Sequence, residues 1–208
     1  MGRNSHLRAT NTVQFSKYFS NTRDVMDTNY QSLTWRQINS YHEELRREIF
    51  GKVESRYSSL SIKANEISYQ NAVEADSWKK LWNKPNRAAS WSWTHLYHQY
   101  HTRSSARRFD MALSRNGGLV GLCYGVMERD RVVLRLHAVE RTPIQSNIIS
   151  DFIDINLYAA NLYARLNNTS EIWICDPVSP AHTRMYQGKG YTPHEDYRGT
   201  VTHLVVKL

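Results

Sequence analysis

The sequence predicts a mixed α/β fold: a mostly antiparallel, twisted sheet flanked by helices, with a helical N-terminal extension. Apolar residues recur at helical spacing up to about residue 82, and the pattern alternates from about residue 107 onward. Turn sequences then separate the successive strands. The 208 residues are enough for one sizeable core with an added N-terminal segment.

The N-terminal half is expected to be helical after a weakly ordered arm. Residues 1–30 are polar and lack periodicity, which is typical of such an arm. Thr34–Val53 has the spacing of an amphipathic helix, and its first residue can cap it. A second helical pattern, interrupted by Ser and Asn, covers about Leu60–Trp82, before Pro85. We therefore expect residues 31–106 to form a helical part that packs on the core.

Residues 107–208 are expected to form that core. Turn sequences at Asn116-Gly117-Gly118 and Arg129-Asp130 separate the first three strands, which we predict at Arg107–Ser114, Leu119–Glu128 and Arg131–Val139. We then expect a helix from about Ser146 to Tyr163, a strand over 171–176, a helix from Ser179-Pro180 to Gly190, and a strand over Gly199–Val206. The second of these helices has Pro at its first helical position and Gly at its end.

The net charge of +8 is unevenly distributed. Residues 1–110 hold 17 Lys and Arg against 10 Asp and Glu, whereas residues 111–208 hold 10 against 9. Such asymmetry is typical of a surface that meets nucleic acid, acidic protein or cofactor phosphates. A solvated basic face that aids solubility would give the same composition.

Compartment and membrane predictions follow from the apolar residues and the cysteines. The chain contains no apolar run suited to a signal peptide or a membrane-spanning helix, so we expect a cytoplasmic protein without membrane association. Cys123 and Cys175 lie in apolar stretches that are typical of buried strands. We expect both to be free thiols in a reducing compartment.

The segment around residues 91–108 is rich in aromatic residues, histidine and arginine. His95, His98 and His101 recur every three residues but have no further Cys, His or acid at zinc-site spacing, so no metal is expected. The aromatic residues could form a core helix packed on the sheet. Together with the basic residues, they could also stack on bases and hold phosphates.

The segment SPAHTRMYQGKGY, Ser179–Tyr191, and the order of three antiparallel strands, helix, strand, helix and strand resemble the GCN5-related N-acetyltransferase (GNAT) superfamily. The resemblance implies an acetyl-CoA-binding site that includes Ser179, and implies that Tyr186 protonates the departing CoA thiolate. A phenol at a crevice of the sheet is a reasonable proton donor. A tyrosine near a helix end can also be simply a packed aromatic residue.

The resemblance further implies that the cofactor lies between the fourth and fifth strands of the family. The backbone of Ala138 and Val139 would then contact pantetheine. The loop that would hold the pyrophosphate, Arg141–Asn147, contains no glycine and so departs from the family pattern. Four residues of this loop remain candidate phosphate contacts. Arg141 offers a positive charge, and three residues offer polar donors close to a helix start: Gln145, Ser146 and Asn147.

The implied activity is acetyl transfer from acetyl-CoA to an amine by direct attack. His137 and Glu140 are the candidate general bases, because they end the strand nearest the expected thioester. A hydrogen-bonded structural histidine is the alternative for His137. The acceptor would be a protein amine, a small amine or aminoacyl-tRNA, and residues 31–106 would line its cleft. The rival function is a non-catalytic GNAT scaffold that binds nucleic acid through its basic N-terminal half.

Overall fold

A computed structural model describes residues 33–81, 91–101, 106–128, 132–144, 151–195 and 199–208. The chain divides into the units Met1–Ile38 and Asn39–Leu208. The described part of the first unit is the beginning of helix α3, where Thr34 and Gln37 exchange hydrogen bonds as a helix cap. The predicted arm over residues 1–30 lies outside the described residues.

The second unit is built on a seven-stranded sheet with the order β1-β2-β3-β4-β5-β7-β6. All neighbouring strands are antiparallel except β4 and β5, which are parallel. This confirms the predicted mixed, mostly antiparallel sheet. The strands are β1 Ile62–Asn65, β2 Arg108–Arg115, β3 Gly118–Met127, β4 Val133–Arg141, β5 Glu171–Cys175, β6 Thr192–Glu195 and β7 Val201–Lys207.

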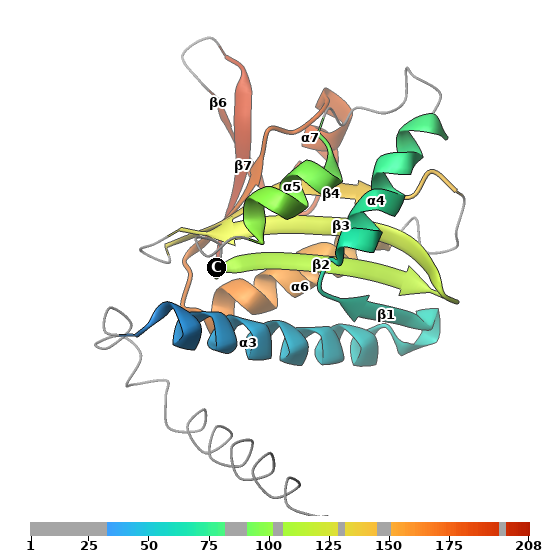
Figure 1. The fold of residues 1–208 in the computed structure, drawn as a ribbon. Coiled ribbons are helices and arrows are strands. Elements are labelled where there is room, and N and C mark those ends of the chain that lie inside the picture. Colours follow the sequence, from blue (N-terminus) through green and yellow to red (C-terminus); the bar gives the residue numbers. More distant parts are fainter. Residues whose placement is uncertain (1–32, 82–90, 102–105, 129–131, 145–150, 196–198) are drawn as a thin grey trace, which may run out of the picture. The chain divides into compact units, whose positions relative to one another are not determined.

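Helices cover both faces of this sheet (Figure 1). One apolar cluster joins the first face to α3, α6 and α7, and a second cluster joins the opposite face to α4 and α5. Among the described residues, no helix is long and apolar enough to cross a membrane. The helices are α3 Trp35–Arg56, α4 Tyr69–Ser77, α5 Trp93–Tyr100, α6 Phe152–Leu166 and α7 Pro180–Gln187.

The interrupted helical pattern predicted over about Leu60–Trp82 is only partly helical. Its first part contains strand β1, in which Ile62 and Ala64 point into the core while Lys63 and Asn65 are exposed. Helix α4 begins only after Ser68, whose side chain accepts a hydrogen bond from the Asn71 backbone while the Asn71 side chain accepts one from the Ser68 backbone. Apolar residues two apart give β1 one buried face at the edge of the sheet. The reciprocal Ser68–Asn71 cap determines where α4 begins.

Strand β4 contains a β-bulge at His137. Tyr124 of β3 faces Ala138, but the next β3 residue, Gly125, faces Leu136, so His137 is the extra residue. A side chain at Gly125 would bring its Cβ to 2.6 Å from the Arg135 carbonyl oxygen and 2.8 Å from a Leu136 methyl carbon. The missing side chain of Gly125 therefore permits the close approach of β4 on which the bulge depends.

We predict that Gly125→Ala destabilises the protein by about 1–3 kcal/mol, because the β4 backbone must move to admit the methyl group. Chemical denaturation would measure the free energy of unfolding. Gly51→Ala is the matched control: at this helical position no atom lies within 4 Å of the place that a Cβ would take, so alanine should stabilise by about 1 kcal/mol or less. Equal effects of the two substitutions would contradict the packing argument.

Candidate active site

The two edges of β4 are paired to different extents. The ladder with β5 runs from Val133–Glu171 to Leu136–Ile174 and stops there. The ladder with β3 continues to the pair of Arg141 and Gly121. Along His137–Val139, the edge of β4 that faces β5 therefore has no strand partner among the described residues. Backbone N–H and C=O groups on such an edge can pair with an extended ligand that contains amides. The amide-containing pantetheine arm of acetyl-CoA fits this requirement.

The start of α6 lies against the end of β4. The ring of Phe152, the first residue of α6, occupies the space that a side chain at Gly121 would need. Because Gly121 faces Arg141 across the sheet, the positive end of the α6 dipole lies near the end of β4. Such a helix start favours phosphate. The candidates Gln145, Ser146 and Asn147 lie outside the described residues.

His137 lies on the face of the sheet that carries α4 and α5. Its ring centroid is 6.4 Å from that of Tyr100 and 6.5 Å from that of Tyr124, while the two tyrosines stack on each other at 4.1 Å. Burial lowers the pKa of His137 below 6.5, and Arg135 lowers it further, with Asp176 opposing. The imidazole is therefore neutral at neutral pH and able to accept a proton.

Glu140, the other candidate base, is in a different environment. Its side chain is buried and accepts a 2.7 Å hydrogen bond from the indole nitrogen of Trp93 on α5. This contact joins the end of β4 to α5. A carboxylate held in this way has an evident structural role in addition to any part in proton transfer.

Tyr186 lies on the opposite face of the sheet from His137. It belongs to the apolar cluster of α3, α6 and α7, and its ring meets that of Tyr191 edge-on at 5.9 Å. Burial raises the pKa of Tyr186, and the nearby groups of Cys123 and Tyr191 raise it further. The phenol is therefore protonated at neutral pH and can donate a hydrogen bond or a proton there.

The remaining described residues predicted to contact the cofactor lie on different elements. Ser179 caps α7, where its hydroxyl accepts from the His182 backbone and is 2.7 Å from the His182 ring nitrogen Nδ1. Ala138 is buried on the α4–α5 side, and Val139 packs on the opposite cluster. The Arg141 guanidinium donates to the Thr142 carbonyl at 3.3 Å.

Three residues near the end of the β4–β5 ladder were not singled out as site residues from the sequence: Asp176, Tyr100 and Tyr124. Cys175, expected in a buried strand, ends β5 and is a free thiol that is only partly buried. Burial raises the pKa of its thiol to about 11, which keeps the thiol neutral. Asp176 follows with a positive φ of 45°, and Tyr100 and Tyr124 line the same side as His137. Position immediately after a short apolar strand was the available signal for Asp176.

The comparison with known proteins identifies the fold. Neither a protein-family model nor a curated protein matches the sequence. Solved structures do match, including an acetyltransferase from Thermus thermophilus, with a TM-score of 0.55, 13% identity, and coverage of 72% of this chain and 98% of that one. A GNAT-family protein from Desulfovibrio desulfuricans matches with a TM-score of 0.52, 9% identity, and coverage of 70% and 98%. YncA from Salmonella typhimurium, solved with acetyl-CoA, matches with a TM-score of 0.51, 12% identity, and coverage of 71% and 94%.

The chain therefore has the GNAT fold. Its β4 and β5 correspond to the fourth and fifth strands to which the sequence resemblance pointed. Identities this low establish the fold and leave the activity to be argued from the site. Across the described segments, no group of three His, Cys, Asp or Glu side chains could hold a metal ion.

The hydroxyl group of Tyr124 provides a test of the polar packing at the site. It is buried without a hydrogen-bond partner in the described structure, so Tyr124→Phe should leave the free energy of unfolding unchanged or raise it by about 1 kcal/mol. Tyr163→Phe is the matched control, because the Tyr163 hydroxyl contacts His42 Nδ1 at 2.7 Å and donates to the Arg108 carbonyl at 3.0 Å. That variant should lose about 1–3 kcal/mol. Chemical denaturation of both variants measures the free energy of unfolding. Losses of equal size in the two variants would contradict the prediction.

Proposed function

We propose that the protein is an N-acetyltransferase that transfers the acetyl group of acetyl-CoA to an amine. The observation that carries the proposal is the end of the β4–β5 ladder at Leu136–Ile174 while β4 remains paired with β3. This exposes a strand edge to an amide-containing ligand. His137 and Tyr186 lie on opposite faces of the sheet, and His137 is the first β4 residue beyond the end of the ladder. A thioester held in the opening would have a base on one side and an acid on the other.

His137 is the better-supported general base. Its lowered pKa leaves the ring unprotonated at neutral pH, and it belongs to the face on which α5 provides Tyr100. An acceptor amine on that face would give a proton to His137, directly or through water, as its nitrogen attacks the thioester carbonyl carbon. Glu140 is engaged by Trp93, so we assign it to positioning α5 against β4.

Tyr186 would act on the departing sulfur. When the carbon–sulfur bond breaks, CoA leaves with a negative charge, which a protonated phenol can stabilise by donating a hydrogen bond. The raised pKa of Tyr186 makes complete transfer of its proton to a thiolate uphill, because a thiol is ordinarily a stronger acid than a phenol. Tyr186 would therefore stabilise the developing charge, the thiolate would take its proton from water as CoA leaves, and His137 would return the amine proton to solvent.

The proposal requires that acetyl-CoA binds and is consumed. Acetyl-CoA at about 100 times its Kd should stabilise the native state by about 2.7 kcal/mol, measured as a rise in Tm. Release of free CoA thiol should then depend on an added amine, with spermidine, lysine and a peptide with a free amino terminus as probes. No stabilisation and no thiol release would contradict the proposal. If RNA binding with steep salt dependence accompanied that result, it would favour the non-catalytic alternative.

The pH dependence of transfer separates the two side chains. In the wild type, kcat/KM should fall with decreasing pH below 6.5, as His137 becomes protonated at its lowered pKa. His137→Gln should lower kcat/KM by about 100-fold or more and remove this acidic limb. Tyr186→Phe, the control, should lower kcat but keep the limb. Steady-state rates between pH 5 and 8 measure this, and an unchanged limb in His137→Gln would exclude His137 as the base.

A further inference from the structure

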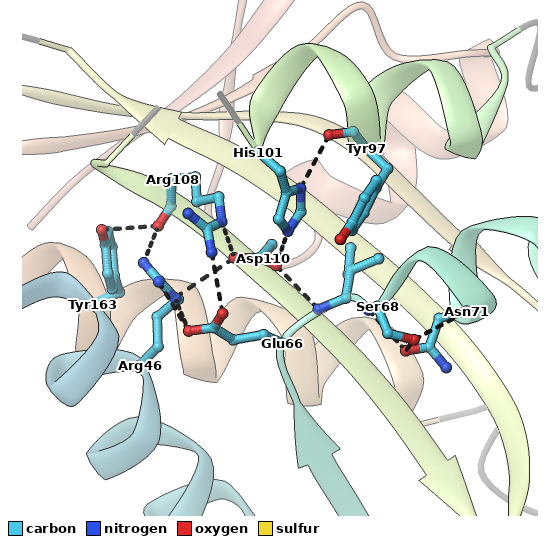
Figure 2. Close-up of polar contacts among 10 residues, drawn as sticks. Arg46, Glu66, Ser68, Asn71, Tyr97, His101, Arg108, Asp110 and Tyr163 are labelled. Carbon is cyan, nitrogen blue, oxygen red and sulfur yellow. Dashed lines mark hydrogen bonds and ion pairs between the residues drawn. The ribbon is translucent and has the colours of Figure 1, made fainter. Parts of the chain in front are cut away.

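Figure 2 shows a network of ionisable side chains around Asp110. We call it the Asp110 cluster, and its five members come from α3, the segment after β1, β2 and the residue that ends α5: Arg46, Glu66, Arg108, Asp110 and His101. The Arg46 and Asp110 side chains are completely buried. The proposed transfer chemistry uses none of these residues.

The Asp110 cluster occupies the edge of β2 where β1 has ended. Strand β1 pairs with β2 only from Ala112 onward. Before that point, the Arg108 carbonyl accepts hydrogen bonds from Arg46 Nη1 at 3.0 Å and from the Tyr163 hydroxyl at 3.0 Å. The side chain of Asp110 accepts a 3.0 Å bond from the Ile67 backbone. Side chains thus supply hydrogen bonds along the part of β2 that β1 does not reach.

Opposite charges are closely matched inside the cluster. Glu66 is 2.8 Å from Arg46 and 3.1 Å from Arg108. Asp110 Oδ1 is 3.1 Å from Arg108 Nε and 3.5 Å from Arg46 Nε. Removing one partner from such a buried arrangement leaves an uncompensated charge, which costs far more than a surface ion pair contributes. The position of the Asp110 carboxylate is therefore strongly determined.

His101 connects this carboxylate to α5. It ends the helix, where its backbone N–H donates to the Tyr97 carbonyl at 3.0 Å, its Nδ1 is 3.0 Å from the same oxygen, and its ring stacks on the Tyr97 ring at 3.9 Å. Its other ring nitrogen, Nε2, lies 3.6 Å from Asp110 Oδ2. Because a carbonyl oxygen can only accept, Nδ1 carries the ring hydrogen, and burial, with a further contribution from Arg108, lowers the pKa of His101. Tyr97 therefore holds His101 at the end of α5, and the neutral ring packs against Asp110.

Tyr100 immediately precedes His101, and its position is coupled to the same strands. Its ring stacks at 4.1 Å on Tyr124, the residue of β3 that directly faces Asp110 of β2. Its ring also lies 6.4 Å from that of His137, with the two planes only 17° apart. A shift of the α5 end would thus change the space in front of His137.

We propose that His101, held by Tyr97 and packed against Asp110, positions Tyr100 against His137, so that Tyr100 forms a wall for the acceptor amine. The inference rests on the proposed function, because it gives these residues a role in that reaction. His101 is a positioning residue, since it would act through Tyr100. The charge cluster thereby links the open edge of β2 to the acceptor side of the site.

Kinetics of His101→Ala, Tyr100→Ala and the double variant test the proposal. With spermidine, lysine and the peptide amine as acceptors, His101→Ala should raise the acceptor KM by about tenfold or more and leave the KM of acetyl-CoA within about twofold. The double variant should be no worse than Tyr100→Ala, because both changes remove the same wall. His95→Ala is the matched control on the exposed side of α5 and should change neither KM. Independent, multiplying effects of His101→Ala and Tyr100→Ala would overturn the proposal.

Hydrogen exchange provides a second measurement that does not depend on turnover. In His101→Ala, the amides at residues 100 and 101 should exchange at least about tenfold faster than in the wild type, whereas those of α6 should not change. Unchanged exchange at these two amides would overturn the positioning role. If the wild type acetylated none of the amines, the proposed function would fail, and the exchange result would still decide whether His101 holds the end of α5.

Discussion

The unequal pairing of β4 is the constraint on which the site depends. One edge is hydrogen-bonded to β3 along nearly its whole length, while the other is paired with β5 for four residue pairs. The parallel pair β4 and β5 joins the antiparallel halves of the sheet, so the end of their ladder leaves an unpaired edge of β4 near the centre of the sheet. The bulge at His137 immediately follows the last pair of that ladder, and it places consecutive side chains, those of His137 and Ala138, on the same face.

Helix α5 completes the acceptor side because contacts at both of its ends determine its position. At its start, the Asp76 carboxylate accepts hydrogen bonds from Ser92, Trp93 and Thr94. Burial alone would raise the pKa of Asp76, but these bonds outweigh it and lower the pKa. Trp93 also donates to Glu140 of β4. The other end of α5 contacts the Asp110 cluster through His101, the residue that follows the helix. A short helix of eight residues thus has tertiary contacts in place of the length that would stabilise it alone.

Local signals predicted the central part of the fold well. The three-stranded meander was predicted because Asn116-Gly117 and the alternating strands are short-range features, and α7 begins at Pro180 after the Ser179 cap, as predicted. Strand β1 was missed because it has only four residues. Its two apolar positions are too few to be distinguished from the helical spacing of Leu60, Ala64 and Ile67 around them. Strand β6 carries no apolar alternation of its own and is formed by pairing with β7.

The sequence by itself determined the class of fold, the order of its core elements and the identity of a few chemically capable side chains, because periodicity, caps and turns act over a few residues. Only the tertiary structure decided which of these side chains share a face. It placed His137 and Tyr186 on opposite faces of the sheet and engaged Glu140 with Trp93. It also brought Asp110 to the end of α5. Strand register, a bulge and the pairing of buried charges depend on residues far apart in the chain, which no local pattern encodes.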